Sequence, residues 1–317
     1  MLWDYLLTFF GAGAVGLALL LISWNTMSKD EEGLVDRAKI AWKALVPGYS
    51  FFATIAVGFA IASAASYLGY LPGNPKVLAW LSFASLVPAW ALVLVDLGAP
   101  ERALSIISGF NKSSRIAWNV VLYTLLTLSL FWTILSPSLC SALATLTFAV
   151  LLETNLGMAF GTSKVPGWEG ASKAAEFVAA AFVMLGVFTL NWPIIAVSAL
   201  ALLLLDFWEL YHTYFEDKEI CKAVSKGGLA IYYALLIASA LVAPLNVYLA
   251  AFLAFVGVLA QKMTSAYWPQ RARLLKAPYK FAFSGEAKFA DTAEIIAFLA
   301  AFLIWVAVMA LGLAFLG

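Results

Sequence analysis

The sequence predicts an all-α integral membrane protein with about ten transmembrane helices. Hydrophobic residues make up 64% of the 317-residue chain and charged residues only 12%, and the mean hydropathy is +0.93. A soluble globule needs more polar surface than this, so lipid is expected to be the main solvent. The basic residues are also segregated, because eighteen of the nineteen Lys and Arg fall in or beside five polar segments. These segments are 26–49, 99–115, 162–173, 214–227 and 262–291, and only Lys76 lies elsewhere.

Runs of about 17–25 apolar residues are long enough to cross the hydrocarbon core of a bilayer. The first run follows Asp4 and has no basic start, so it is expected to be a retained helix and not a cleaved signal peptide. The links that carry almost no charge are short and contain Pro, which is typical of helical-hairpin turns. All five polar segments then lie on one face of the membrane. The expected spans are 5–24, 50–71, 77–98, 116–136, 139–161, 174–191, 193–213, 228–243, 245–262 and 292–316.

Residues 228–262 allow two interpretations, namely two short helices or one long tilted helix. Pro244 and Asn246 lie in the middle of this run. Two helices are preferred because Pro244 favours a turn and the polar segments then stay on one face. A single helix would reverse the direction of the last span.

No long repeat or low-complexity linker interrupts the chain, so residues 1–317 are expected to form a single membrane domain. The one long early loop, 26–49, has apolar residues at helical spacing. It is predicted to be either an interfacial helix or a solvated linker helix without a partner.

The cofactors that this chain could bind alone are limited by its residue types. His212 is the only histidine, so the chain cannot supply two His ligands to a haem. Cys140 and Cys221 are expected on opposite faces of the membrane, so neither a disulfide nor a four-thiolate cluster is expected. No P-loop or dinucleotide-binding motif is found. The formal net charge of +1 gives no sign of nucleic-acid binding.

Carboxylates inside the predicted spans are the candidate functional groups, because charges in hydrocarbon are costly and usually mark a site or a pathway. Glu153 lies two turns before the end of its span, roughly 12 Å below the charged face. Asp206, Glu209 and His212 follow at steps of three, close to one helix face. Asp96 ends the third span and Glu176 opens the sixth.

Each of these residues also has a structural explanation. Asp96 could be only a neighbour of the following turn, and Glu176 could only stabilise a helix N-terminus through the dipole. The Asp206–His212 face could be a solvated helix end. Glu153 favours a function more strongly, because it is the deepest and Asn155 follows it.

Two stretches resemble the NrfD-like family, the quinone-interacting membrane subunits of polysulfide-reductase-type respiratory complexes. Residues 96–103 read Asp-Leu-Gly-Ala-Pro-Glu-Arg-Ala and residues 110–119 read Phe-Asn-Lys-Ser-Ser-Arg-Ile-Ala-Trp-Asn. The family pattern is Asp-Leu-Gly-Arg-Pro-Glu-Arg followed by Phe-Asn-x-x-Ser-x-x-Ser-Trp-Gly. Residues 47–52, Pro-Gly-Tyr-Ser-Phe-Phe, and 165–168, Val-Pro-Gly-Trp, also agree. The agreement covers about residues 47–170.

The resemblance implies two four-helix bundles plus two peripheral helices. The first bundle would be 47–161 and would hold a quinone site, and the second would be 174–262. Segments 1–25 and 292–317 would be the peripheral helices.

The resemblance also implies a function, namely that of the membrane anchor and quinone/quinol-reactive subunit of a respiratory oxidoreductase complex in the plasma membrane. Such a chain is the non-catalytic subunit of the complex and binds a menaquinone-type quinone but no haem or iron–sulfur cluster. It exchanges electrons with an iron–sulfur subunit, and through it with a catalytic subunit, for example of molybdopterin type. Proton movement is left open.

Quinol oxidation needs a donor to the carbonyl oxygens, an apolar slot and a base within hydrogen-bond reach. Tyr49 would donate, Glu153 would accept a proton, and Asp96 would pass protons outward. Glu153 or Thr154 would stand near the family's pocket tyrosine. The expected cofactor-binding residues are Tyr49, Ser50, Trp118, Asn119 and Asn155, the catalytic residues are Glu153 and Asp96, the proton-pathway candidates are Asp206, Glu209 and His212, and no metal ligand is expected.

The chain departs from the family at two positions, since no His lies near Tyr49 and Ala99 replaces the usual Arg. Both departures concern the hydrogen bond to one quinone carbonyl and the type of quinone. Orientation is also open, because the positive-inside rule favours a cytoplasmic charged face, whereas many relatives dock their partner on the outer face.

Two other classes of protein fit part of the sequence. A proton-coupled secondary transporter would explain ten helices and intramembrane carboxylates, with Glu153 or Asp206 as the coupling site. Its sites usually lie near the midplane, whereas these carboxylates crowd one half of the membrane. A purely structural anchor for a soluble partner is the third reading.

Overall fold

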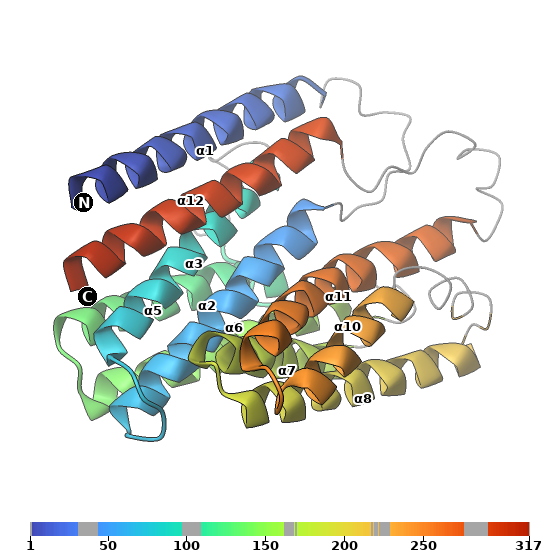
Figure 1. Ribbon diagram of the computed structural model, residues 1–317. Helices are drawn as coiled ribbons and strands as arrows, with labels where there is room; N and C mark the ends of the chain where they lie inside the picture. The colour runs from blue at the N-terminus through green and yellow to red at the C-terminus, as the bar shows by residue number, and fades with distance from the viewer. Residues whose placement is uncertain are drawn as a thin grey trace.

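The computed structural model describes residues 2–30, 44–96, 109–161, 168, 170–216, 218, 221, 229–275 and 291–316. Ten helices lie within these ranges (Figure 1). They are α1 (Leu2–Asp30), α2 (Leu45–Tyr67), α3 (Pro75–Asp96), α5 (Arg115–Leu135), α6 (Leu139–Gly161), α7 (Gly170–Thr189), α8 (Trp192–Glu216), α10 (Leu229–Val242), α11 (Val247–Leu275) and α12 (Thr292–Leu316).

Eight of these helices are long and apolar enough to cross a membrane. The other two apolar segments are shorter, Phe10–Ser23 within α1 and Leu229–Val242, which is α10. The 14 residues of α10 span roughly 21 Å at 1.5 Å per residue, less than the usual hydrocarbon thickness. The chain is an all-α, multi-pass membrane protein, as its composition predicts.

The ambiguous stretch at 228–262 forms two helices. α10 ends at Val242 and α11 begins at Val247, and Pro244 lies in the turn between them. The backbone N–H of Asn246 donates to the Val242 carbonyl at 2.9 Å, and its side-chain oxygen accepts from the N–H of Leu249 at 3.1 Å. Asn246 therefore closes one helix and caps the next.

Similar caps fix the other hairpins. Ser138 and Ser141 exchange hydrogen bonds between backbone N–H and side-chain oxygen at 2.9 and 3.1 Å, at the start of α6. Asn191 accepts from the N–H of Ile194 at 3.3 Å as α8 begins. Each cap satisfies backbone donors that lipid could not.

The helices form two groups of four with a pair outside. Helices α2, α3, α5 and α6 pack in a closed ring, as do α7, α8, α10 and α11. Helices α1 and α12 pack on each other and α12 lies against α3, where the indole of Trp80 donates to the Val308 carbonyl at 3.0 Å. Both chain termini lie at one end of the molecule, opposite the end where α8 and α11 stop (Figure 1).

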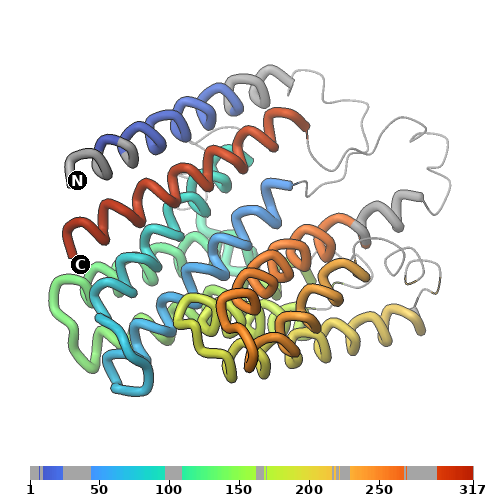
Figure 2. The backbone as a smooth tube through the Cα atoms, viewed as in Figure 1, coloured from blue at the N-terminus to red at the C-terminus, as the bar shows by residue number. Residues whose placement is uncertain are grey.

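Helix α2 joins the two groups, because it packs on α6 and α7 and also contacts α11. Figure 2 shows it running through the middle of the molecule. Nineteen of the 23 residues of α2 are buried, so this apolar helix has protein and not lipid on almost every side. Gly58 permits the approach to α7, since an added Cβ would lie 2.9 Å from the Cβ of Met184.

Several helices extend further toward the charged end than the sequence predicted, and α7 and α11 are the two that carry buried lysines there. α7 begins at Gly170 and not at 174, and α11 continues to Leu275 and not to 262. Lys173 and Lys262, assigned above to polar segments, therefore lie inside helices, and both are buried. The pattern of charges along the sequence does not predict that these two lysines are buried.

Candidate functional site

Glu153 is fully buried, on α6, where α2 and α11 approach it. Thr54 Oγ1 lies 2.5 Å from Glu153 Oε1, and Lys262 Nζ lies 3.6 Å from the same oxygen. The other oxygen, Oε2, has no hydrogen-bond partner among the described residues. Glu153 therefore keeps one oxygen able to bind a proton or to accept a hydrogen bond.

The Thr54 hydroxyl has two acceptors but only one proton. It lies 2.9 Å from the Ser50 carbonyl and 2.5 Å from Glu153 Oε1. If its proton points to the Ser50 carbonyl, the short contact is a hydrogen bond only when the Glu153 carboxyl is protonated and donates. If it points to Glu153, the carboxylate accepts. Thr54 can thus serve both protonation states of Glu153.

Lys262 has an unusual environment for an ammonium group. It is 1% exposed, and Nζ lies 3.0 Å from the centroid of the Phe177 ring. Within the described ranges Nζ makes no hydrogen bond. A buried cation without hydrogen bonds is expensive, so Glu153 and the face of Phe177 are what hold this charge.

A tyrosine that the sequence did not single out lies close enough to Glu153 to interact with it electrostatically. Tyr123 of α5 is buried, packs on Trp90 with ring centroids 5.1 Å apart, and interacts electrostatically with Tyr49 and Glu153. Its hydroxyl has no hydrogen-bond partner in the described part of the chain. Tyr123 carries no charge and lies in an ordinary apolar run, so no sequence signal marks it.

Tyr49 and Asp96 lie at the edge of this site. Tyr49, in the first turn of α2, is half-buried and interacts electrostatically with Asp96. Asp96 is the last residue of α3 and is exposed. Its position suits an exchange of protons with the solution better than a contact with a buried ligand.

The other predicted cofactor-binding residues already have protein partners. Asn155 Nδ2 donates to Asn119 Oδ1 at 2.6 Å and to the Arg115 carbonyl at 2.9 Å. Ser50 donates to the Pro47 carbonyl at 2.9 Å. Trp118 is 39% exposed, and its indole donates to the Lys112 carbonyl at 3.0 Å. In this arrangement Asn119 and Asn155 tie α5 to α6, and Trp118 points outward.

A second polar cluster lies in the other group of helices. Lys173 and Glu176 of α7 form an ion pair with 2.7 Å between Nζ and Oε2, and Lys173 also pairs with Glu209 of α8. Gln261 Nε2 of α11 donates to Glu176 Oε2 at 3.4 Å and to Asp206 Oδ1 at 3.5 Å. All five side chains are buried. We call these residues, Lys173, Glu176, Asp206, Glu209 and Gln261, the carboxylate cluster.

The carboxylate cluster bears on the predictions made for Glu176 and for the face of Asp206, Glu209 and His212. Glu176 is not only a helix-end partner, because it is fully buried and pairs with Lys173. Asp206 and Glu209 lie together as their spacing predicts, and one oxygen of each lies within 4.8 Å of one from Glu176. His212 is half-buried beside Trp208, with ring centroids 4.7 Å apart, outside this cluster.

A small cavity adjoins the carboxylate cluster. Its volume is about 40 Å³, enough for a few water molecules by the criterion of one probe sphere each. It lies toward the charged end, since Thr213 and Pro269 are further along α8 and α11 than the acids. Its lining includes Lys173, Asp206, Glu209, Thr213, Tyr232, Thr264 and Ser265.

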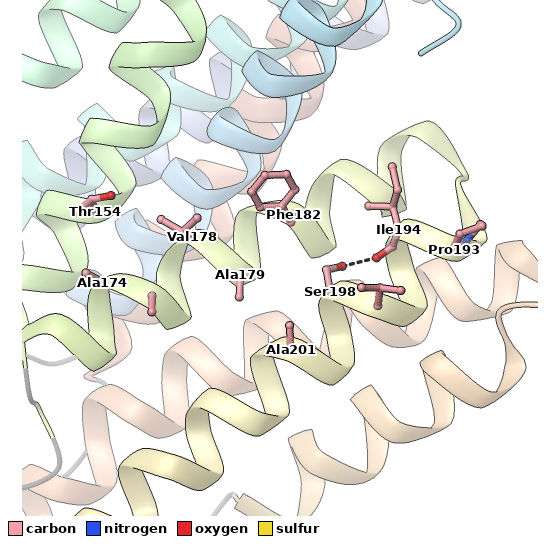
Figure 3. A pocket seen from close by; sticks show the side chains of 11 residues that line it. Thr154, Ala174, Val178, Ala179, Phe182, Pro193, Ile194, Ser198 and Ala201 are labelled. Carbon is pink, nitrogen blue, oxygen red and sulfur yellow. Dashed lines mark hydrogen bonds between the residues drawn. The ribbon is translucent and has the colours of Figure 1, made fainter. Parts of the chain in front are cut away.

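A larger apolar groove lies on the outer side of α6, α7 and α8, with a volume of about 810 Å³. Figure 3 shows its lining, with Thr154 near one end and Pro193 near the other. Ser198 spends its hydroxyl on the Ile194 carbonyl at 2.5 Å, so the wall is almost wholly apolar. The lining includes Thr154, Ala174, Ala175, Val178, Ala179, Phe182 and Ala201. Such a groove fits a hydrocarbon chain.

Some of the residues on which the sequence predictions rest lie outside the described ranges. This holds for the loop 97–108 with Arg102, for 165–167, and for the helix expected within 26–49 beyond Asp30 and before Ala44. No protein-family model matches the chain, and no curated protein matches it.

Proposed function

We propose that this chain is the quinone-reactive membrane subunit of a respiratory oxidoreductase complex, with Glu153 as the group that takes a proton from quinol. The observation that carries the proposal is Glu153 itself, a fully buried carboxyl with one oxygen on Thr54 and the other without a partner among the described residues. A carboxyl with no task would be costly at this depth. The motif resemblance at 96–119 supports the same assignment.

The residues near Glu153 have the chemistry that a quinone requires. When bound, a quinone supplies two-electron, two-proton redox chemistry. Tyr123 offers a buried hydroxyl without a hydrogen-bond partner in the described ranges, and Glu153 Oε2 offers an acceptor. Glu153 lines neither cavity described above, but its neighbour Thr154 lines the apolar groove, whose wall suits an isoprenoid tail.

The protein groups divide the work of holding and moving a proton. Tyr123 would donate to a carbonyl oxygen and position it, while Glu153 would accept the proton that leaves. The Thr54 hydroxyl can rotate between the Ser50 carbonyl and Glu153, so it stabilises the carboxyl before and after transfer. Electrons would leave to an iron–sulfur partner at the charged face, because the chain has too few His and Cys to hold redox centres of its own.

The test is Glu153→Gln in the intact complex, assayed as quinol-linked electron transfer in membranes. Gln keeps the shape and can still hydrogen-bond to Thr54 but cannot hold the proton, so turnover is expected to fall by roughly 100-fold or more while the complex assembles. Glu294→Gln is the matched control, since Glu294 accepts from the N–H of Asp291 at the start of α12 and Gln can do the same. Wild-type turnover in Glu153→Gln at every pH would refute the assignment.

A second candidate function is a proton-coupled transporter, and the carboxylate cluster favours it because it places buried acids and a lysine at the centre of the second group of helices. The two functions differ in what accompanies the protein. Gentle purification should bring down bound quinone and an iron–sulfur subunit if the chain is a quinone-reactive subunit. A transporter would bring down neither and would move protons across vesicles only with its solute.

A further inference from the structure

The Glu153 site and the carboxylate cluster meet on one helix. Gln261 and Lys262 are consecutive in α11: the Lys262 ammonium lies 3.6 Å from Glu153 Oε1, and the Gln261 amide donates to Glu176 and Asp206. The electrostatic interactions of Lys262 include both Glu153 and Glu176. Lys262 therefore interacts electrostatically with both sites, and the groups involved lie on α6, α11, α7 and α8.

The formal charges of this chain of groups do not balance. Along this path the described residues contribute four buried carboxyls, Glu153, Glu176, Asp206 and Glu209, against two buried ammonium groups, Lys173 and Lys262; the fifth buried carboxyl, Glu294, lies apart from them on α12. Full ionisation would leave two uncompensated negative charges inside the protein, at a cost of several kcal/mol each. Two protons or another cation must neutralise them. Each carboxyl has an oxygen that could hold a proton, since Glu153 Oε2, Glu176 Oε1, Asp206 Oδ2 and Glu209 Oε1 all lack a hydrogen-bond partner among the described residues.

Protons fit this arrangement better than a metal ion. The three carboxyls of Glu176, Asp206 and Glu209 are close enough together to ligate a cation. Lys173 already places its ammonium on two of them, at 2.7 Å from Glu176 Oε2 and in contact with Glu209. A divalent ion there would face that ammonium at close range, whereas a proton needs only one free oxygen.

The small cavity is the exit path that we assign to protons leaving the carboxylate cluster. It is lined by Lys173, Asp206 and Glu209 at one side and by Thr213 and Ser265 toward the charged end. Hydroxyl groups and a lysine supply the polar partners that buried water needs. Asp206 and Glu209 therefore border a cavity that is large enough for a few water molecules and that lies toward the end where α8 and α11 stop.

We propose that Lys262 couples the two sites, so that a proton arriving at Glu153 expels a proton from the carboxylate cluster. Protonation of Glu153 removes the charge that holds the ammonium. Lys262, which has no hydrogen bond within the described residues, then turns toward Glu176, and its positive charge displaces one proton through the cavity. One proton enters at Glu153 and one leaves at Asp206 or Glu209, so charge is conserved. The origin of the first proton rests on the proposed function.

The titratable groups around this path come from six helices. They are Tyr123 of α5, Glu153 of α6, Lys173 and Glu176 of α7, Asp206 and Glu209 of α8, and Tyr232 and Tyr233 of α10, with Lys262 of α11 between them. The tyrosines can relay protons but add no charge near neutral pH.

The coupling can be tested without quinol. Infrared difference spectra of the purified full chain in nanodiscs, recorded as a function of pH, report the carbonyl stretch of protonated carboxyls. The component that Asp206→Asn removes belongs to the carboxylate cluster. We expect Glu153→Gln to shift the midpoint of that component by about one pH unit, and the shift to disappear when Lys262→Met is present in both backgrounds. The double variant Glu153→Gln/Lys262→Met leaves no unpaired charge at the Glu153–Lys262 pair, so it covers the case in which Lys262→Met alone fails to fold.

Each outcome decides the proposal. An unshifted midpoint in Glu153→Gln, or an equal shift with Lys262→Met in both backgrounds, would show that Lys262 couples nothing. If the midpoint moves on adding Mg²⁺ or Ca²⁺, or on adding a chelator, a metal ion and not protons neutralises the carboxylate cluster, and the proposal is wrong. Loss of quinol turnover in Glu153→Gln, with no coupling in the spectra, would keep the quinone function and reject only the relay. Coupling in the spectra together with normal quinol turnover in Glu153→Gln would keep the relay and reject the quinone function.

Discussion

The Thr54 hydroxyl makes the short hydrogen bond to Glu153, with 2.5 Å between Thr54 Oγ1 and Glu153 Oε1, and Thr54 is fully buried. Val has nearly the same shape but neither donates nor accepts a hydrogen bond. Replacing Thr54 therefore leaves one more carboxyl oxygen without a partner in a dry site, which costs about 1–3 kcal/mol.

Thr54→Val is expected to lower quinol-linked turnover by roughly 10-fold or more without preventing assembly. The measurement is turnover against quinol concentration in membranes that carry the complex. Thr189→Val is the matched control. Thr189 makes the same kind of hydrogen bond, to the Leu185 carbonyl four residues earlier, but it ends α7 on the side away from the charged end and from Glu153. Equal losses in both variants would show that Thr54 only stabilises its helix.

The sequence marks Glu153 well but not its partners. A carboxylate deep in an apolar run stands out, whereas Thr54 and Tyr123 lie in runs where nothing distinguishes them from packing residues. Lys173 was placed outside its helix and Lys262 at the very end of its helix, because both border charged segments, where local composition favours a loop. Their burial depends on acids in other helices, Glu209 for Lys173 and Glu153 for Lys262. Such pairings follow from tertiary packing and have no local signal.

Among the helices, the contact between α6 and α7 joins the helix that carries Glu153 to the helix that carries Lys173 and Glu176. Gly157 makes it possible, because a Cβ there would lie 2.5 Å from the Lys173 carbonyl oxygen and 2.6 Å from the Ala174 Cα. These are backbone atoms, which cannot rotate away as a flexible side chain would. Any larger residue must push the two helices apart.

Gly157→Ala is expected to lower the stability of the protein by about 1–3 kcal/mol, because overpacking here moves backbone against backbone. The thermal midpoint of the purified protein in detergent should fall. Gly11→Ala is the control, since beyond its chain neighbours and its own helix backbone nothing lies within 4 Å of a Cβ at that position of α1, and Ala favours helix over Gly. A midpoint in Gly157→Ala equal to that of Gly11→Ala would contradict the close packing of α6 on α7.

Helix number and class were accessible from composition and run length, because lipid imposes a minimum length on each span. The residues at which helices end were harder to predict from the sequence. Ser138, Asn191 and Asn246 show why hairpins are easier, since short polar caps appear directly in the sequence. At the charged end, α7 and α11 continue past their apolar runs, and only burial against other helices explains how far.

For the whole molecule, the end where α8 and α11 stop is the proposed docking face of the iron–sulfur partner. Arg115 is a poor probe of this face, because its guanidinium donates to Asn155 Oδ1 at 3.3 Å and so belongs to the α5–α6 contact. Lys112 is exposed and precedes α5 at the same end. Arg102 lies outside the described residues.

Charge reversal of Lys112 together with Arg102, written Lys112→Glu and Arg102→Glu, is expected to loosen the complex and make its dissociation more sensitive to salt. The measurement is the yield of co-purified iron–sulfur subunit across a series of salt concentrations. Lys76→Glu is the control, since Lys76 begins α3 at the opposite end. An unchanged yield in the double variant would place the partner elsewhere.

The position of α2 has a consequence for biogenesis. Its neighbours α7 and α11 are made long after it, because the chain is synthesised from the N-terminus. Until then, Thr54 and Ser50 must lie in the bilayer without the helices that later enclose them, and Glu153 must wait for Lys262. A nascent chain released after α6 would thus expose these polar groups to lipid, where membrane quality control can recognise an unfinished product. Completion of α11 is what turns α2 from a lipid-facing helix into the interior of the protein.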